Sequence, residues 1–233
     1  MLKRVLLSLA VGASAFAGTW DVATNFNAPN NPLASGVFSY GSGGVPTGFS
    51  VMPVITPDCI GTPTECLNNG VSFPGTSSIA WNGTGGTIAL GTPNVFPGFV
   101  NMDPQLSSGT IVRFTAPWTD IYSMAGNYKG DDSGQHPTTG SVYHNNSLLA
   151  SVGVNTFQAL TPIGFSNLAL NAGDTIDFIV TTASDCCFLS TGIGAVITSQ
   201  TDGQAPEPGT LLLIPAGLAL VMWRARRRPT EIR

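Results

Sequence analysis

The fold is indicated most clearly by Asn171-Ala172-Gly173-Asp174-Thr175-Ile176-Asp177-Phe178-Ile179-Val180. Its first four residues are the small, polar and glycine types that tight turns require. The next six alternate, and because successive side chains of a strand point to opposite sides of a sheet, Ile176, Phe178 and Val180 share one face. The stretch therefore predicts a turn that leads into a strand with one buried face.

The same alternation recurs along the body of the chain, and no stretch from Trp20 to Gly203 keeps a helical period. Val112 and Phe114 are expected to face the core, with Arg113 on the opposite side. Asn145-Asn146 tolerates positive φ and suits a hairpin turn. Further strands are expected over residues 121–128, with Tyr122, Met124 and Tyr128 on one face, and over residues 141–144, 148–154 and 192–198. Short strands separated by turns predict an all-β, antiparallel sandwich.

The charge of the chain is unevenly distributed. Residues 18–203 hold eleven acidic residues, and Arg113 and Lys129 are their only basic residues, so this body carries a net charge of −9. We expect no binding to nucleic acid, because a body without a basic stripe cannot neutralise phosphates. Its 186 residues suit one domain.

The N-terminus has the three parts of a secretory signal peptide. Lys3 and Arg4 supply positive charge, residues 5–11 are apolar, and Ala15-Phe16-Ala17 fits the small-x-small rule for cleavage. We expect residues 1–17 to be removed after Ala17 and the body, residues 18–203, to be exported. The alternative is a buried first helix, to which the charged start would contribute nothing.

The C-terminus combines the tripeptide Pro206-Glu207-Pro208, the apolar span 209–223 and an arginine cluster that resists crossing a bilayer. The cluster consists of Arg224, Arg226, Arg227 and Arg228. Residues 205–233 resemble the PEP-CTERM sorting signal of Gram-negative bacteria, which an exosortase recognises. The resemblance implies export, a transient stay in the inner membrane, and delivery to the cell surface or an extracellular polysaccharide matrix. The alternative is an ordinary anchor, but the span would reach only about 22 Å across a hydrocarbon core of about 30 Å.

Residues 88–199 carry a second resemblance. The succession from Arg113 to Pro117, then from Leu170 to Phe178, then from Gly192 to Thr198 is similar to the jelly-roll domains of secreted bacterial proteins. The resemblance implies an antiparallel, jelly-roll-like β-sandwich, flanked here by the signal peptide and a single short C-terminal transmembrane helix. It supports a fold more than a function, because one sandwich scaffold hosts many activities.

The four cysteines are expected to form disulfides, since the chain is bound for an oxidising compartment. They are Cys59, Cys66, Cys186 and Cys187, and four thiols permit three connectivities. We favour Cys59 with Cys66, which would leave a vicinal Cys186–Cys187 bridge. Cross-links between the two segments are the open alternative.

The carboxylates of the body bear on whether the protein is an enzyme. A glycoside hydrolase needs two of them about 5–9.5 Å apart, but Glu65 is the only glutamate of the body and no catalytic arrangement of acid and base is recognisable. We therefore expect a non-enzymatic protein, with a polysaccharide hydrolase as the alternative.

Asp131-Asp132 lies in a glycine-bearing loop and is a candidate calcium site, because hard cations prefer carboxylate oxygens. Solvated turn residues are the competing interpretation, and no other cofactor is expected.

Flat aromatic rings can stack on the apolar faces of sugars. Trp81, Trp118 and Tyr128 are the candidates for such a platform, and packing against the core is the competing interpretation for each.

We expect an exported, exosortase-sorted protein of the cell surface or exopolysaccharide that acts as a matrix or glycan-binding component. A structural surface module without a ligand is the second alternative.

Overall fold

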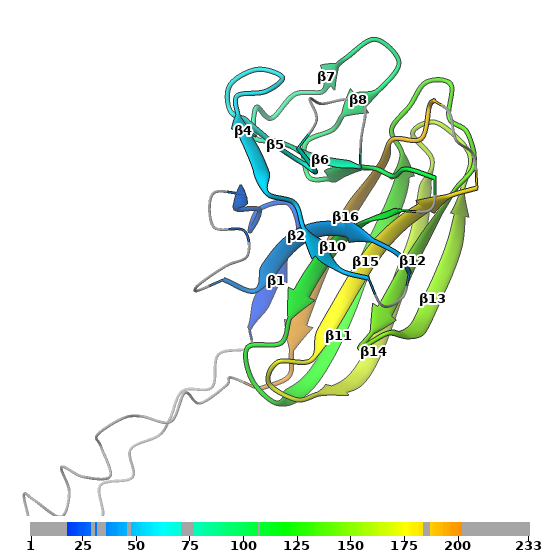
Figure 1. Ribbon diagram of the computed structural model, residues 1–233. Coiled ribbons are helices and arrows are strands. Elements are labelled where there is room, and N and C mark those ends of the chain that lie inside the picture. The colour runs from blue at the N-terminus through cyan, green and yellow to red at the C-terminus, as the bar shows by residue number, and fades with distance from the viewer. Residues whose placement is uncertain are drawn as a thin grey trace, which may run out of the picture. The chain divides into compact units, whose positions relative to one another are not determined.

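The described residues form two large antiparallel β-sheets that face each other (Figure 1) and a separate two-stranded sheet. The structure is a computed structural model and describes residues 18–28, 31, 36–45, 48–70, 77–106, 108–183 and 187–201. The predicted signal peptide, the sorting tripeptide, the apolar span 209–223 and the arginine cluster lie outside these residues. All described residues belong to Met1–Asp202, the first of two units into which the chain divides. Within them, no helix has the length and apolar character that a membrane crossing requires.

The strands are separated by turns and loops, as the sequence predicts, and the described residues contain no α-helix. In chain order the strands are β1 (Thr19–Asp21), β2 (Phe38–Gly43), β3 (Ser50–Val51), β4 (Val54–Pro57), β5 (Thr64–Asn68), β6 (Ser78–Asn82), β7 (Ile88–Ala89), β8 (Asn94–Val95), β9 (Val100–Asp103), β10 (Gly109–Thr115), β11 (Asp120–Gly130), β12 (Thr138–His144), β13 (Ser147–Val154), β14 (Leu160–Leu170), β15 (Thr175–Thr182) and β16 (Thr191–Ser199).

The last eight strands pair as a nested series. β9 pairs with β16, β10 with β15, β11 with β14, and β12 with β13, all antiparallel. This is the pairing of one long hairpin that has rolled up, so its strand pairs fall alternately into two sheets. The orders are β14-β11-β16-β9 in the first sheet, called sheet A here, and β13-β12-β15-β10 in the second, sheet B. Eight strands in two such sheets are a jelly roll, which confirms the predicted sandwich.

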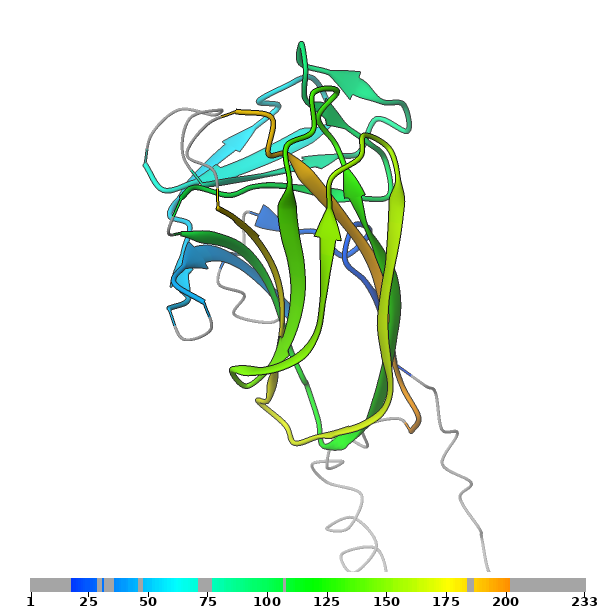
Figure 2. The same cartoon turned by 90° about the vertical axis from the view of Figure 1, so that its right-hand side faces the viewer.

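The N-terminal third of the body extends both sheets. β2 and β3 continue sheet B beyond β10, and β6, β5 and β4 continue sheet A beyond β9. β1 pairs with the C-terminal half of β16, while β9 pairs with its N-terminal half. Figures 1 and 2 show β4–β8 at one end of the sandwich, beside the loops that connect the longer strands there.

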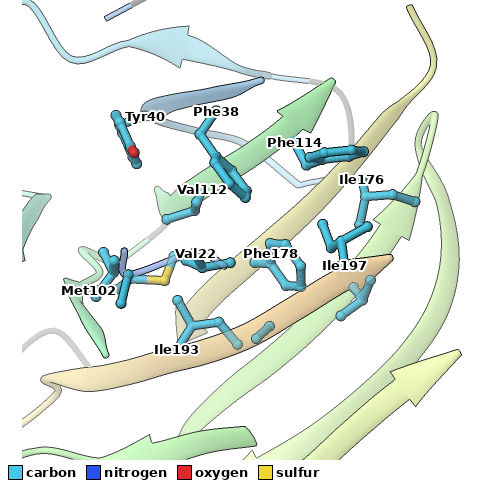
Figure 3. Close-up of a cluster of buried hydrophobic side chains, with 14 of the residues drawn as sticks. Val22, Phe38, Tyr40, Met102, Val112, Phe114, Ile176, Phe178, Ile193 and Ile197 are labelled. Carbon is cyan, nitrogen blue, oxygen red and sulfur yellow. The ribbon is translucent and has the colours of Figure 1, made fainter. Parts of the chain in front are cut away.

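The core lies between the two sheets. Figure 3 shows side chains from β2, β10 and β15 directed toward those from β9 and β16. The predicted inward faces are confirmed, because the following are all buried: Val112, Phe114, Tyr122, Met124, Tyr128, Ile176, Phe178 and Val180. Each such side chain contributes about 1.5–3 kcal/mol to folding relative to an exposed position. The alternating pattern therefore suffices to select the inner face of these strands.

Two local predictions about the chain are also confirmed. Asn145 and Asn146 adopt φ values of 44° and 72° and connect β12 to β13, which is the geometry of the favoured two-residue hairpin. Cys59 and Cys66 form a disulfide with their Cα atoms 6.0 Å apart, across the hairpin of β4 and β5. Cys187 is also disulfide-bonded, and Cys186 lies outside the described residues.

Candidate functional site

A cleft of about 460 Å³ opens at the end of the sandwich where β9 and β11 finish and β16 begins. This end cleft is formed by four segments: the β7–β8 turn, the end of β9 with the loop after it, the loop after β11, and the segment before β16. Its lining residues are Leu90, Thr92, Pro93, Asp103, Pro104, Gln105, Leu106, Asp132, Cys187, Phe188, Leu189 and Ser190. Clefts of about 300–1,000 Å³ with an apolar wall and a few polar groups are typical of small-ligand sites.

Backbone hydrogen bonds hold three of these segments together. The Asp131 N–H donates to the Ser190 carbonyl at 2.9 Å, and the Asn94 N–H donates to the Asp131 carbonyl at 2.7 Å. The Ser133 N–H donates to the Thr92 carbonyl at 2.9 Å. The loop after β11 thus lies between the β7–β8 hairpin and the entry to β16 and is bonded to both. These three walls of the end cleft are therefore held together by the protein's own backbone, and such preorganisation lowers the entropic cost of binding.

Asp103 and Asp132 bring two carboxyl groups to the end cleft. Asp132 is buried, and its Oδ1 accepts a hydrogen bond of 3.2 Å from the Gly134 N–H. Burial and the negative charge of Asp132 together raise the pKa of Asp103 to about 6. Poor solvation and a neighbouring negative charge each disfavour the ionised form of a carboxyl group.

Asp131 lies beside the cleft but not in its lining. Its carboxyl group packs against Gly192 on the outer side of sheet A, and the Asn101 amide donates to its Oδ2 at 2.9 Å. Its Oδ1 is buried and has no hydrogen-bond partner among the residues that the structure describes. Burial raises the pKa of Asp131 to about 8, despite the opposing effects of Asn101 and Lys129.

The two predicted calcium ligands, Asp131 and Asp132, lie in different surroundings. Both carboxyl groups are buried, so the interpretation as solvated turn residues is wrong. The two side chains serve different places, since only Asp132 lines the cleft. Across the described part of the chain, no group of three or more histidine, cysteine or acidic side chains is arranged to hold a metal ion.

Phe188 and Leu106 form the exposed apolar part of the cleft, with 37% and 48% of their surfaces accessible. Phe188 has a φ of 62°, in the left-handed region that phenylalanine rarely adopts. Its ring packs over Gly134, where an added Cβ would lie 3.1 Å from a ring carbon. A strained backbone that presents an aromatic ring to solvent is a common property of binding sites.

The three aromatic residues predicted to stack on sugar lie elsewhere and are not brought together. Tyr128 is fully buried, and its hydroxyl donates to the Ser141 carbonyl at 2.8 Å, so the prediction of an exposed platform is wrong for this residue. Trp81 is half-buried and stacks on Phe26 with ring centroids 5.8 Å apart. Trp118 packs on Trp20 at 5.3 Å, at the opposite end of β11 from Asp132. Both tryptophans pack against the core.

Sequence reasoning missed Asp103, Leu106 and Phe188. Asp103 ends β9 beside a proline, and Phe188 follows the cysteine pair, but neither position carries a motif. Because the two residues are 85 positions apart, only the pairing of β9 with β16 places them in one cleft. The acidic pair at 131–132 was the only available signal for this end of the molecule.

The two cations of the described body are both engaged away from the cleft. Arg113 donates from Nε and Nη2 to the two carboxylate oxygens of Asp177, each at 2.7 Å. The Lys129 ammonium lies 3.1 Å from the centroid of the Phe96 ring, and burial lowers its pKa. No described residue that lines the cleft is lysine, arginine or histidine. The acidic groups of the cleft therefore have no basic partner in its wall.

Comparison with known proteins places the chain in no family. No family model matches it, and no curated protein matches it. Among solved structures, a family 35 carbohydrate-binding module from Paenibacillus barcinonensis aligns with a TM-score of 0.32 and 11% identity, covering 78% of this chain and 98% of the module. A family 51 module from Clostridium perfringens aligns with a TM-score of 0.31 and 9% identity, covering 43% and 69%. At these values the similarity establishes neither a common family nor a ligand.

Proposed function

We propose that this chain is an exported, non-enzymatic β-sandwich protein that binds a glycan in the end cleft. The observation that carries the proposal is the combination of a buried carboxyl group, Asp132, a partly buried one, Asp103, and the exposed ring of Phe188 in one cleft. Carboxylates accept hydrogen bonds from sugar hydroxyls, and an aromatic ring covers the apolar face of a pyranose. Gln105 and Ser190 add further polar groups to the same wall.

Sorting by an exosortase is the second part of the proposal. Its support is the order of Pro206-Glu207-Pro208, the apolar span 209–223 and the terminal arginines, together with the signal-peptide pattern of residues 1–17. The Cys59–Cys66 disulfide agrees with a life outside the cytoplasm, because such bonds persist in oxidising compartments. The protein would pass through the inner membrane and act at the cell surface or in the polysaccharide matrix.

A glycan array probed with the purified full-length protein tests the binding function, and isothermal titration then measures the affinity for each hit. We expect at least one glycan class to bind, and the Phe188→Ala variant to lose most of that affinity. The matched control is Leu160→Ala, which truncates an exposed apolar side chain on β14, outside the cleft. Folded protein that binds no glycan, or that binds equally well without Phe188, contradicts the proposal.

A polysaccharide hydrolase is the second candidate, because two carboxyl groups face one cleft and the pKa of Asp103 is raised to about 6. The general acid of a glycosidase likewise carries a raised pKa. Release of reducing ends from a bound polysaccharide, lost in Asp103→Asn and Asp132→Asn alike, would establish this activity. Binding without product release leaves the non-enzymatic function in place.

A further inference from the structure

The end cleft holds an excess of negative charge that the protein itself does not balance. Asp103 and Asp132 line it, and no described lining residue is a lysine, arginine or histidine. Arg113 is held by Asp177, and Lys129 lies over Phe96. Since the body of residues 18–203 carries a net charge of −9, no long-range positive field compensates the cleft.

This charge distribution selects among glycans. A uronic acid or sulfated sugar would place its anion beside two carboxylates and be repelled. A neutral sugar could use the acids only as hydrogen-bond acceptors. A sugar with a free ammonium group would supply the missing counter-charge, and hydrogen bonds from charged donors to carboxylates are about twice as strong as neutral ones.

The apolar wall favours a ring over a flexible chain as the carrier of the ammonium. Phe188 and Leu106 expose apolar surface next to the acids, and the C–H face of a pyranose can lie flat on such a surface. An aromatic face also attracts a cation directly when the cation comes within about 6 Å of the ring centroid. A lysine side chain could satisfy the acids, but it would leave much of this wall uncovered.

We propose, building on the glycan-binding function above, that the end cleft is specific for amino sugars with free ammonium groups, such as glucosamine units in a de-N-acetylated polysaccharide. Asp132 and Asp103 pair with the ammonium, and Phe188 covers the apolar face of the ring. Gln105 and Ser190 line the same cleft and would bond the hydroxyl groups. Acetylation of the amine would remove the charge and replace it with a bulky neutral amide.

The test is isothermal titration of the full-length protein with three matched hexasaccharides: β-1,4-linked glucosamine, its fully N-acetylated form, and the glucose analogue. We expect the glucosamine hexamer to bind at least about tenfold more tightly than either neutral one. Asp132→Asn should remove most of that preference, and Asp103→Asn serves as the second variant if the first fails to fold. Asp58→Asn is the control, because it removes the same charge at an exposed turn outside the cleft.

Each result decides between the possibilities. Equal or tighter binding of a neutral hexamer overturns the amino-sugar inference and leaves glycan binding intact, whereas failure of every glycan to bind folded protein overturns both. A pentalysine peptide that binds as tightly as the glucosamine hexamer would show a general ammonium site and contradict the sugar assignment. Calcium chloride that binds alone, with loss in Asp132→Asn and no binding of glucosamine, would assign the acids to a metal and also overturn the inference.

Discussion

The backbone N–H of His136 donates a hydrogen bond to the carbonyl oxygen of Phe188 at 2.9 Å, and the two rings meet edge to face with centroids 5.4 Å apart. This contact joins the loop after β11 to the segment before β16, two parts of the chain that are distant in sequence. It also fixes the direction in which Phe188 presents its ring. The aromatic wall of the cleft is thus positioned by the same loop that carries Asp132.

Truncation of this ring should therefore weaken ligand binding without unfolding the protein. Phe188→Ala is expected to lower the affinity for a bound glycan about tenfold, which corresponds to about 1.4 kcal/mol. His136→Ala keeps the backbone hydrogen bond and should have a smaller effect. Titration calorimetry measures the affinity of both variants. Leu160→Ala is the control, because it also truncates an exposed apolar side chain. If Phe188→Ala binds the glycan as tightly as the parent protein and Leu160→Ala do, Phe188 is excluded from the site.

The buried acids should make the protein less stable as the pH rises. Asp131 has a folded-state pKa of about 8, well above the value of about 3.9 in an unfolded chain, so the folded state binds the extra proton. The stabilisation is complete below about pH 4 and is lost as the pH rises through about 8, with a slope of at most about 1.4 kcal/mol per pH unit for this group. Asp103 acts in the same direction up to about pH 6.

Asp131→Asn should flatten this dependence, because an amide keeps the shape of the side chain and cannot ionise. The charged groups around Asp131 are Lys129 and Asp132, and Asn101 donates to it. Urea unfolding at a series of pH values between about 5 and about 8 measures the change. A variant that loses stability with pH as steeply as the parent protein would contradict the assignment to Asp131.

The Arg113–Asp177 pair should be worth several kcal/mol when it is broken on one side only. Side-chain exposures of 22% for Arg113 and 2% for Asp177 mean that Arg113→Ala strands a buried carboxylate. We expect a loss of about 3 kcal/mol in the free energy of unfolding, the lower end for buried pairs. The double variant Arg113→Met/Asp177→Leu should lose much less, because no charge is left unpaired. Additive losses in a double-mutant cycle would refute the coupling.

Reduction of the Cys59–Cys66 disulfide should lower stability modestly. The two cysteines are seven positions apart, and closing so short a loop constrains the unfolded chain by about 2 kcal/mol. Cys66 is buried beside Ala80 and Val95, so Cys59→Ser is the safer single variant. Thermal unfolding of Cys59→Ser beside the parent protein measures the change and leaves the disulfide of Cys187 in place. An unaffected midpoint would show that the hairpin of β4 and β5 does not need the bond.

Replacement of Pro206-Glu207-Pro208 by three alanines should block sorting and retain the protein in the inner membrane. Mass spectrometry of the mature form checks both ends of the chain, with Gly18 expected as the first residue. The parent protein should appear at the cell surface or in the medium without the apolar span 209–223. Normal delivery of the alanine variant would show that the tripeptide is not the signal.

Local pattern predicted much of the sandwich, because side-chain alternation and turn chemistry depend on neighbours in sequence. This local pattern was enough to predict the inward faces of β10, β11 and β15 and the Asn145–Asn146 turn. The favoured Cys59–Cys66 pairing is confirmed, although the β4–β5 hairpin that carries it was not predicted. The candidate site could not be predicted from the sequence, because its parts come from four segments that share no motif.

Composition and local periodicity were enough to give the fold class, the inward faces of β10, β11 and β15, and the acidic character of the body. Which polar and aromatic groups face one another depends on how distant strands pair. Antiparallel pairing of β16 with β9 and β11 brings Asp103, Asp132 and Phe188 to one end of the sandwich. Asp132 is buried there and Asp103 partly buried, which distinguishes both from the exposed aspartates. The difference depends on neighbours that are distant in the chain, so the local sequence does not reveal it.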